Sequence, residues 1–256
     1  MNRAGPLRKT LRLVRRGTIV LWCVGGCLLE YAARAASGLL KTSNRAHVLH
    51  KWSRRLLAGV NAGIVVSGRA PDQGMIVSNH LSYLDILVFS AVSHCVFVAK
   101  REVKAWPGVG WIASLGGTIY IDRSRRTDTH SIQPEIQAAL AGGVRLVVFP
   151  EGTSSDGSRV LPFHSSLFQP AVDLNTAITP AAIAYAIPDG DPATEACYWG
   201  DMTLATHFLT LLTKDSVQAT LTFSSQQFRF SDRKQAAQAM QAEVERLLQS
   251  NVAARA

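Results

Sequence analysis

The chain has 256 residues, enough for one sizeable α/β core with an additional segment at one end. Its formal net charge is +9, but residues 1–60 hold twelve of the 27 lysines and arginines and one of the 18 acidic residues. The basic excess therefore belongs to the N-terminal segment and suits an anionic surface there. The chain has no Gly-x-x-x-x-Gly-Lys phosphate loop and no Gly-x-Ser-x-Gly elbow, which argues against P-loop proteins and common serine hydrolases.

The first predicted element is an apolar helix near the N-terminus. Thr18–Leu29 is an uncharged run that would be about 18 Å long as a helix, against a bilayer core of about 30 Å. Extending the run to Leu40 reaches a spanning length but includes Glu30 and Arg34. We favour a helix that dips into one leaflet. A single transmembrane span is a second interpretation, and a signal peptide cleaved near Ala33-Arg34-Ala35 is a third.

A second basic segment follows, with an apolar stripe at helical spacing and cations beside it. The stripe is Val48, Leu49, Trp52, Leu56 and Val60, and the cations are Arg45, Lys51, Arg54 and Arg55. This helix either packs on the core or lies on a membrane with its tryptophan near the headgroups. The basic residues of the N-terminal segment belong to apolar helices that have no aromatic stacking platform. We therefore expect membrane lipid and not nucleic acid as the partner of this segment. We thus predict a membrane-associated helical segment at residues 1–60 and one α/β domain at residues 61–256.

The α/β domain is predicted from strands that alternate with helices. The expected strands are 63–67, 75–78, 96–100, 118–121, 145–149, 181–186 and 217–223. The expected helices are 83–92, 131–141, 166–174, 202–212 and 233–248. This order favours a mixed, mostly parallel sheet flanked by helices.

The four cysteines, Cys23, Cys27, Cys95 and Cys197, form no Cys-x-x-Cys pair and no His-rich cluster. We expect them to be small buried residues, in a reducing compartment and without a structural metal.

The most informative stretch begins at Asn79, directly after an apolar strand. His80 and Asp85 are five residues apart, which on one helix would point them about 140° away from each other. They can meet only if His80 lies on the turn before a helix and Asp85 in its first turn. Ser82 and Asp85 have the spacing of a capping box that would open this helix. In this arrangement the carboxylate would orient an imidazole that acts as a general base, whereas the plain alternative is a capping carboxylate beside a polar loop residue.

A second stretch ends another strand. Val144–Phe149 is followed by Pro150-Glu151-Gly152-Thr153-Ser154-Ser155, whose small and hydroxyl residues fit an anion-binding turn at the carboxyl edge of a sheet. The alternative is an ordinary Gly/Ser turn.

Together these stretches resemble the glycerolipid acyltransferase family, which includes 1-acylglycerol-3-phosphate acyltransferases. The resemblance covers about residues 60–225 and rests on four motifs in the family's order. These are Asn79-His80-x4-Asp85, Gly117-x-Ile119-x-Ile121-x-Arg123, Phe149–Thr153 with Ser155, and the apolar stretch Ile178–Ile183 around Pro180.

The resemblance implies an acyltransferase that moves a fatty acyl group from a thioester donor to the hydroxyl of a lysophospholipid. His80 and Asp85 would be catalytic. Glu151, Gly152 and Thr153 would bind the acceptor, Arg123 would meet its anionic group, and Lys100 is a weaker candidate for the same contact. The donor would be acyl-CoA or acyl carrier protein, with no bound cofactor or metal. The expected location is the cytoplasmic face of the inner membrane.

One departure from the family pattern concerns the acceptor. Ser154 stands where the third motif usually has arginine, which weakens the case for a phosphate-bearing acceptor. Together with Tyr198–Met202, it resembles bacterial relatives that acylate lyso-ornithine lipids. Asp201 would then pair with an amine or, as the plainer role, cap a helix. The acceptor is thus 1-acylglycerol-3-phosphate or, as an alternative, lyso-ornithine lipid; a lipid-binding protein without turnover is a further alternative.

Overall fold

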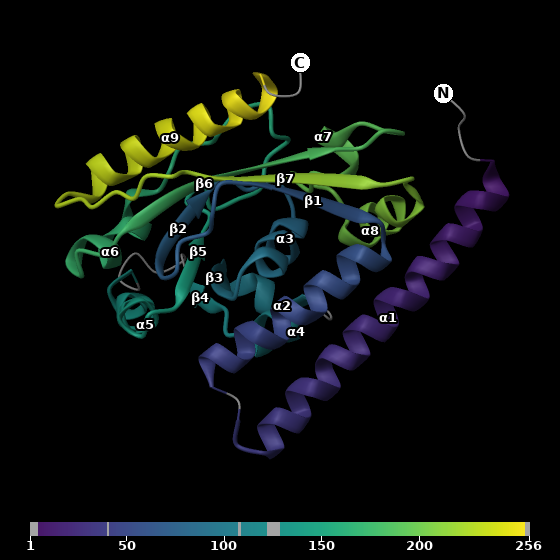
Figure 1. Ribbon diagram of the computed structural model, residues 1–256, viewed down its shortest axis with the longest axis horizontal. Coiled ribbons are helices and arrows are strands. Elements are labelled where there is room, and N and C mark those ends of the chain that lie inside the picture. Colours follow the sequence, from purple (N-terminus) through teal and green to yellow (C-terminus); the bar gives the residue numbers. More distant parts are fainter. Residues whose placement is uncertain (1–4, 40, 107–108, 122–128, 254–256) are drawn as a thin grey trace.

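The computed structural model describes residues 5–39, 41–106, 109–121 and 129–253. A seven-stranded sheet runs through the molecule in the order β1-β7-β6-β2-β5-β3-β4 (Figure 1). Its strands are β1 Ala62–Ser67, β2 Gly74–Ser78, β3 Cys95–Lys100, β4 Ile119–Ile121, β5 Arg145–Val148, β6 Ile178–Ala186 and β7 Val217–Phe223. Only β6 and β7 pair antiparallel, so β1 and β7 run opposite to the other five. The predicted mixed, mostly parallel sheet is confirmed.

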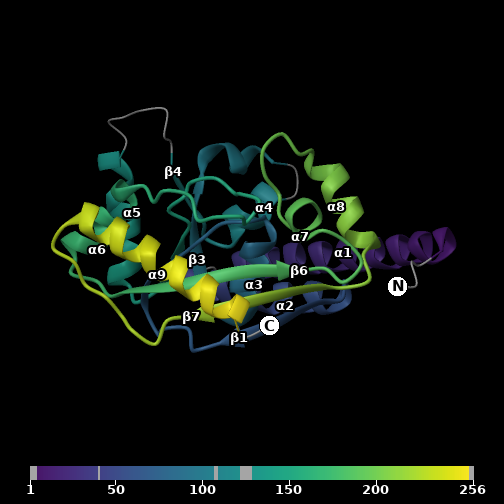
Figure 2. The ribbon, with the colours of Figure 1, turned by 90° about the horizontal axis from the view of Figure 1, so that it is seen from above.

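Helices cover both faces of the sheet. α2 Thr42–Gly59 and α3 Leu84–Val92 lie on one face, and α5 Thr129–Ala141, α6 Gln169–Asp173 and α9 Arg233–Ala253 lie on the other. α1 Pro6–Ala36 packs outside α2 and against α8 Leu204–Thr213. Figure 2 shows α9 in front of β6 and β7, with α1 behind them. Short helical turns complete the fold: η1 Arg101–Ala105, α4 Val109–Leu115, η2 Ser165–Phe168 and α7 Pro192–Glu195.

The central strands are mostly apolar because helices bury both sides of them. Ile76, Val147 and Ile183 point to the face with α3, whereas Met75 and Leu146 point to the face with α9. All of these side chains are fully buried.

All seven predicted strands are present, each within three residues of its expected bounds. The five predicted helices are also present, although the one expected at 166–174 is a 3₁₀ turn followed by α6. The short elements η1, α4 and α7 were not predicted, since four to seven residues carry too little periodicity. The last helix continues to Ala253, five residues beyond its expected end.

The N-terminal helices form an antiparallel pair. α1 is one continuous helix of 31 residues that buries Cys23, Cys27 and Tyr31 against Val48 and Trp52 of α2. The described cysteines are all free and buried, as expected. The helix is long and apolar enough to cross a membrane, by length and composition only.

An ionic contact between α1 and α2 involves Glu30 and explains the position of Trp52. Glu30 of α1 accepts hydrogen bonds from Lys51 Nζ at 2.7 Å, Trp52 Nε1 at 2.9 Å and Arg34 at 3.0 Å. Burial opposes the charge, but these hydrogen bonds lower the pKa of Glu30 to about 2. Trp52 is 8% exposed and lies between the two helices. The alternative that placed Trp52 near lipid headgroups is therefore wrong, because the side chain is buried and its indole N–H donates to the half-buried Glu30 carboxylate.

Two of the N-terminal arginines hold α1 to the end of α8. Arg16 is 2% exposed and donates to the carbonyls of Leu212 at 3.1 Å and Asp215 at 3.0 Å. Arg12 donates to the Thr213 carbonyl at 2.7 Å and pairs with the Asp215 carboxylate. Cations at a helix C-terminus satisfy its last carbonyls and its dipole. Part of the basic excess is thus used inside the protein.

Candidate active site

The candidate site lies where β2 and β5 end, at the carboxyl edge of the sheet. These strands are parallel neighbours, and Val77 of β2 pairs with Val148 of β5. His80 and Glu151 each stand three residues beyond that pair. The register therefore brings the first and third motifs together, although 71 residues separate them.

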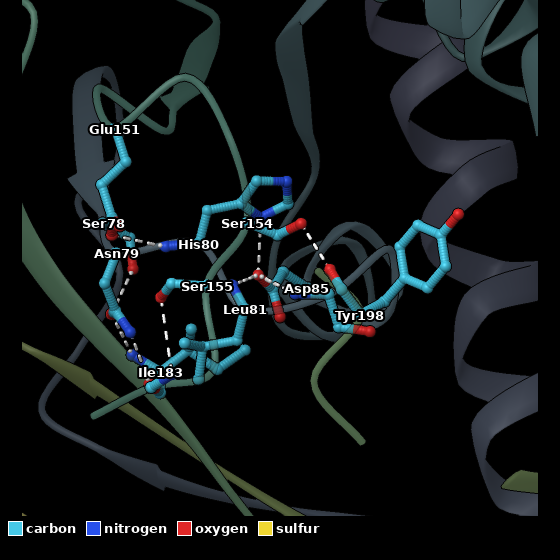
Figure 3. Close-up of polar contacts among 12 residues, drawn as sticks. Ser78, Asn79, His80, Leu81, Asp85, Glu151, Ser154, Ser155, Ile183 and Tyr198 are labelled. Carbon is cyan, nitrogen blue, oxygen red and sulfur yellow. Dashed lines mark hydrogen bonds and ion pairs between the residues drawn. The ribbon is translucent and has the colours of Figure 1, made fainter. Parts of the chain in front are cut away.

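His80 and Asp85 meet in the arrangement that the spacing predicts. His80 lies on the loop before α3, and Asp85 lies in the first turn of that helix. His80 Nδ1 is 2.7 Å from Asp85 Oδ2, and the Asp85 side chain is fully buried. The same oxygen accepts the backbone N–H of Leu81 at 2.7 Å and of Ser82 at 3.1 Å (Figure 3).

The predicted capping box forms only in part. Asp85 accepts the Ser82 amide, as the motif requires, but the buried Ser82 hydroxyl has no hydrogen-bond partner among the described residues. The cap position is Tyr83, which has helical backbone angles and makes no side-chain cap. The helix begins one residue later than a box opened by Ser82 would need, so this hydroxyl does not reach the N3 amide.

Phe149 fixes the plane of the imidazole. Its ring stacks on the His80 ring with the centroids 4.3 Å apart and the planes 16° apart. Because Nδ1 donates to Asp85, the neutral ring carries its lone pair on Nε2, which points away from Asp85 (Figure 3). The His80 side chain is 22% exposed, which leaves the ring accessible to a substrate. The arrangement suits a general base.

Glu151 supports the backbone of the catalytic loop. It is 3% exposed, and its two oxygens accept the amides of His80 at 2.9 Å and Leu161 at 3.1 Å. Burial raises the pKa of this carboxyl to about 7, and the hydrogen bonds from the two amides oppose the rise. Its role in acceptor binding stays a prediction, since both oxygens are engaged by backbone here.

The other predicted acceptor residues lie along the same edge. Gly152 has a φ of 68°, a conformation that favours glycine, and it turns the chain so that Thr153 is exposed. Lys100 is exposed at the end of β3, two strands from β2 and thus about 10 Å across the sheet. Arg123 lies outside the described residues. The acceptor-binding roles of all these residues stay predictions.

Two further links hold the catalytic loop in place. The Asn79 side chain extends the sheet: its Nδ2 donates to the Ile183 carbonyl and its Oδ1 accepts the Ile183 amide, both at 2.9 Å. On the other side, the Ser155 amide donates to the His80 carbonyl at 3.0 Å. Asn79 is 2% exposed, so it supports the loop and does not contact solvent.

Ser154, the departure from the family pattern, contacts the Tyr198–Met202 segment. Its hydroxyl donates to the backbone carbonyl of Tyr198, whose own amide donates to the Leu81 carbonyl at 2.8 Å. Residues 44 positions apart thus meet beside the catalytic loop (Figure 3). Asp201 is exposed and caps no helix, because α8 begins at Leu204 with Thr203 as its cap residue. The expected capping role is therefore wrong.

Sequence reasoning missed Tyr185 of β6, whose hydroxyl donates to Asp85 Oδ1 at 2.6 Å. The ring is 7% exposed. A signal was present: Tyr185 is the only hydroxyl in the apolar run 180–187, and a buried phenol needs a hydrogen-bond partner.

Three other histidines gather at the opposite edge of the sheet. The His94 ring lies 4.4 Å from that of His50 and 5.1 Å from that of His47. His50 Nδ1 contacts the Ser90 carbonyl at 2.8 Å. His50 and His94 line a cavity of about 340 Å³ together with Arg69, Asp72 and Arg145.

Comparisons with known proteins show what the chain is similar to. The acyltransferase family model matches residues 64–184. A lyso-ornithine lipid O-acyltransferase of Pseudomonas aeruginosa is 35% identical over 80% of each chain. A 1-acyl-sn-glycerol-3-phosphate acyltransferase of Neisseria meningitidis is 34% identical over 58% of each chain. The crystal structure of the 1-acyl-sn-glycerophosphate acyltransferase of Thermotoga maritima has the same fold, with a TM-score of 0.68, 20% identity and 96% of this chain covered.

Proposed function

The chain belongs to the acyltransferase family, and within it we propose transfer of a fatty acyl group from a thioester donor to the free hydroxyl of a lysophospholipid. The observation that carries this proposal is the His80–Asp85 pair, with Nδ1 fixed at 2.7 Å from the carboxylate and Nε2 directed outward. Acyl-CoA or acyl carrier protein would supply the acyl group at the cytoplasmic face of the inner membrane.

In the proposed reaction the acceptor hydroxyl is the nucleophile. His80 Nε2 takes its proton as the oxygen attacks the thioester carbonyl, and Asp85 stabilises the imidazolium that forms. Collapse of the tetrahedral intermediate forms the ester bond and breaks the C–S bond. The leaving thiolate then takes the proton from His80, so the enzyme returns to its starting state without a covalent intermediate.

The oxyanion of the intermediate needs hydrogen-bond donors. The helix-start amides of Leu81 and Ser82 already donate to Asp85, and the Gly152 amide donates to the Phe149 carbonyl at 3.0 Å. We therefore assign the stabilisation of the oxyanion to the backbone N–H groups of the next two residues of the turn, Thr153 and Ser154.

Two acceptors fit this site. 1-Acylglycerol-3-phosphate is favoured by the four motifs and by an exposed Lys100 at the same edge, which would meet its phosphate. Lyso-ornithine lipid is favoured by the contact between Ser154 and Tyr198, since both features that resemble the bacterial relatives then lie beside the His80 loop. An exposed Asp201 would then meet the amine of that acceptor.

The acceptor test is acyl transfer by the detergent-solubilised protein. Labelled acyl-CoA and acyl carrier protein are each offered with lysophosphatidic acid and with lyso-ornithine lipid. Product with one acceptor alone identifies the headgroup. The absence of product with every pair, or equal activity in His80→Ala, would contradict the proposed reaction.

We propose that α1 associates with the membrane through one face. Its exposed apolar residues fall within a stripe about 100° wide, opposite the face that buries Cys23 and Cys27. The stripe consists of Leu7, Leu11, Val14, Leu21, Trp22 and Leu29. Because the other face is packed on the protein, lipid can reach only one side of the helix. We therefore place α1 in one leaflet with its apolar stripe in the acyl region.

The membrane test is flotation with vesicles that contain anionic lipid. Leu21→Glu/Leu29→Glu should lower the bound fraction at least tenfold, since it puts charge in the apolar stripe. Leu174→Glu is the matched control, because Leu174 is 41% exposed at the end of α6. Equal flotation of the double variant and the control would rule out this placement.

A further inference from the structure

Tyr185 lies beneath the catalytic pair because β6 is longer than its neighbour. Ser78, the last residue of β2, pairs with Ala181, and β6 continues for five more residues to Ala186. This overhang places Ile183 against Asn79 and Tyr185 against Asp85. On its other side, Tyr185 pairs with Ala219 of β7, whose small side chain leaves room for the ring.

The two oxygens of Asp85 have different partners. Oδ2 accepts His80 Nδ1 and the amides of Leu81 and Ser82. Oδ1 accepts the Tyr185 hydroxyl at 2.6 Å. Tyr185 thus binds the oxygen that does not face the imidazole, and a donor at that oxygen draws charge away from the one that does.

We propose that Tyr185 is a positioning residue that disperses the charge of Asp85 and thereby sets the pH at which His80 becomes available as a base. This rests on the proposed function of the His80–Asp85 pair. The tyrosine does not touch substrate; it acts through the carboxylate. A stronger donor weakens the attraction between Asp85 and the imidazolium, and the loss of the donor strengthens it.

Tyr185 remains a donor across the physiological range. Burial, and then the neighbouring Asp85 carboxylate, raise the pKa of Tyr185 well above the usual tyrosine value. The groups that face it from other elements are Tyr83 and Cys197. Burial raises the pKa of both, that of Cys197 to about 12, so both stay neutral.

The groups facing His80 are Asp85 from α3 and Glu151 from the loop after β5. Burial raises the pKa of Glu151 to about 7, so this carboxyl titrates near neutral pH. An activity profile alone would therefore mix two groups. A direct titration of the His80 ring separates them.

The test follows the His80 ring by NMR in protein labelled at histidine Cε1, with the signal assigned by its absence in His80→Gln. In Tyr185→Phe we expect the midpoint of the His80 titration to rise by about half a pH unit. The acid limb of kcat/KM should move by the same amount, with the plateau within about threefold of wild type. A merely structural role would lower thermal stability and leave both midpoints in place.

A matched control and a variant of opposite sign make the test sharper. Tyr31→Phe removes another buried hydroxyl, which donates to the Arg45 carbonyl at 3.0 Å, and should leave the His80 midpoint unchanged. Replacement of Tyr185 by 3,5-difluorotyrosine makes the phenol a stronger donor and should lower the midpoint. An unchanged midpoint in both Tyr185 variants would overturn the proposal. Shifts of opposite sign without detectable acyl transfer would support the coupling and reject the proposed function.

Discussion

Two sets of histidines lie at opposite edges of the same sheet. His80, at the carboxyl edge, has Nδ1 on a buried carboxylate and its ring plane fixed by Phe149. His50 and His94, at the amino edge, pack edge to face, and His50 Nδ1 contacts a backbone carbonyl. Burial, and then neighbouring cations and histidines, lower the pKa of His94; burial likewise lowers that of His50.

The difference teaches that the partner of a histidine decides its chemical role, since His80 and His50 are both half-buried. An imidazole beside a carboxylate can accept a proton and be stabilised as the cation. Imidazoles packed against one another and near Arg145 repel added protons. We therefore assign the chemistry to the carboxyl edge and expect the amino edge to influence stability alone.

The largest expected effect comes from removing the base. His80→Ala should lower kcat/KM by about 10³-fold, because general-base catalysis contributes about 10² to 10⁴. His94→Ala should change it less than twofold. The measurement is acyl transfer under identical conditions. Comparable losses in the two variants would break the distinction between the edges.

The next largest effect is expected from changing Asp85, the carboxylate partner of His80. Asp85→Asn places an amide where the carboxylate accepts three N–H groups and one hydroxyl, so its NH₂ would face a donor. We expect kcat/KM to fall about 10²-fold or more and stability to fall by about 2 kcal/mol. Chemical denaturation with parallel transfer assays measures both. A fully active Asn variant would show that His80 needs no carboxylate.

A smaller effect, with a pH signature, comes from Glu151. Its pKa of about 7 lies above the ordinary 4.5, so the folded state binds more protons between these values. Its contribution to stability is therefore full below about 4.5 and is lost as the pH rises through about 7. Glu151→Gln should remove this decline and lower kcat/KM about tenfold, since one loop amide loses its acceptor. Thermal unfolding from pH 4.5 to 8 tests the sign.

The smallest effect is expected at the amino edge, where the pH dependence of stability has the opposite sign to that of Glu151. The pKa of His94 is lowered, so the unfolded chain binds more protons in mild acid. Stability should fall as the pH drops below about 6.5, the unfolded value. Arg145, His47 and His50 face His94 and remain in the variant. His94→Gln should make this decline shallower in thermal unfolding and leave transfer unchanged; an identical decline would exclude the histidine cluster as its cause.

Local sequence determined much of this protein. Apolar runs between turn residues located every strand, and the five-residue spacing of His80 and Asp85 required the loop-then-helix arrangement that the structure has. Both follow from short-range geometry, namely the period of a strand and the pitch of a helix. Each acyltransferase motif likewise spans only a few residues.

The tertiary structure alone decided which residues of different strands and helices contact one another. The register of β2 against β5 brings Glu151 to the His80 amide, and the overhang of β6 brings Tyr185 to Asp85. From sequence, Arg16 belongs to a basic segment that suits an anionic surface, and the helix with Trp52 either packs on the core or lies on a membrane. In the structure both side chains are buried in contacts with distant carboxylate or carbonyl groups. No local pattern encodes such pairs, because strand order and register depend on how the whole chain buries its apolar surface.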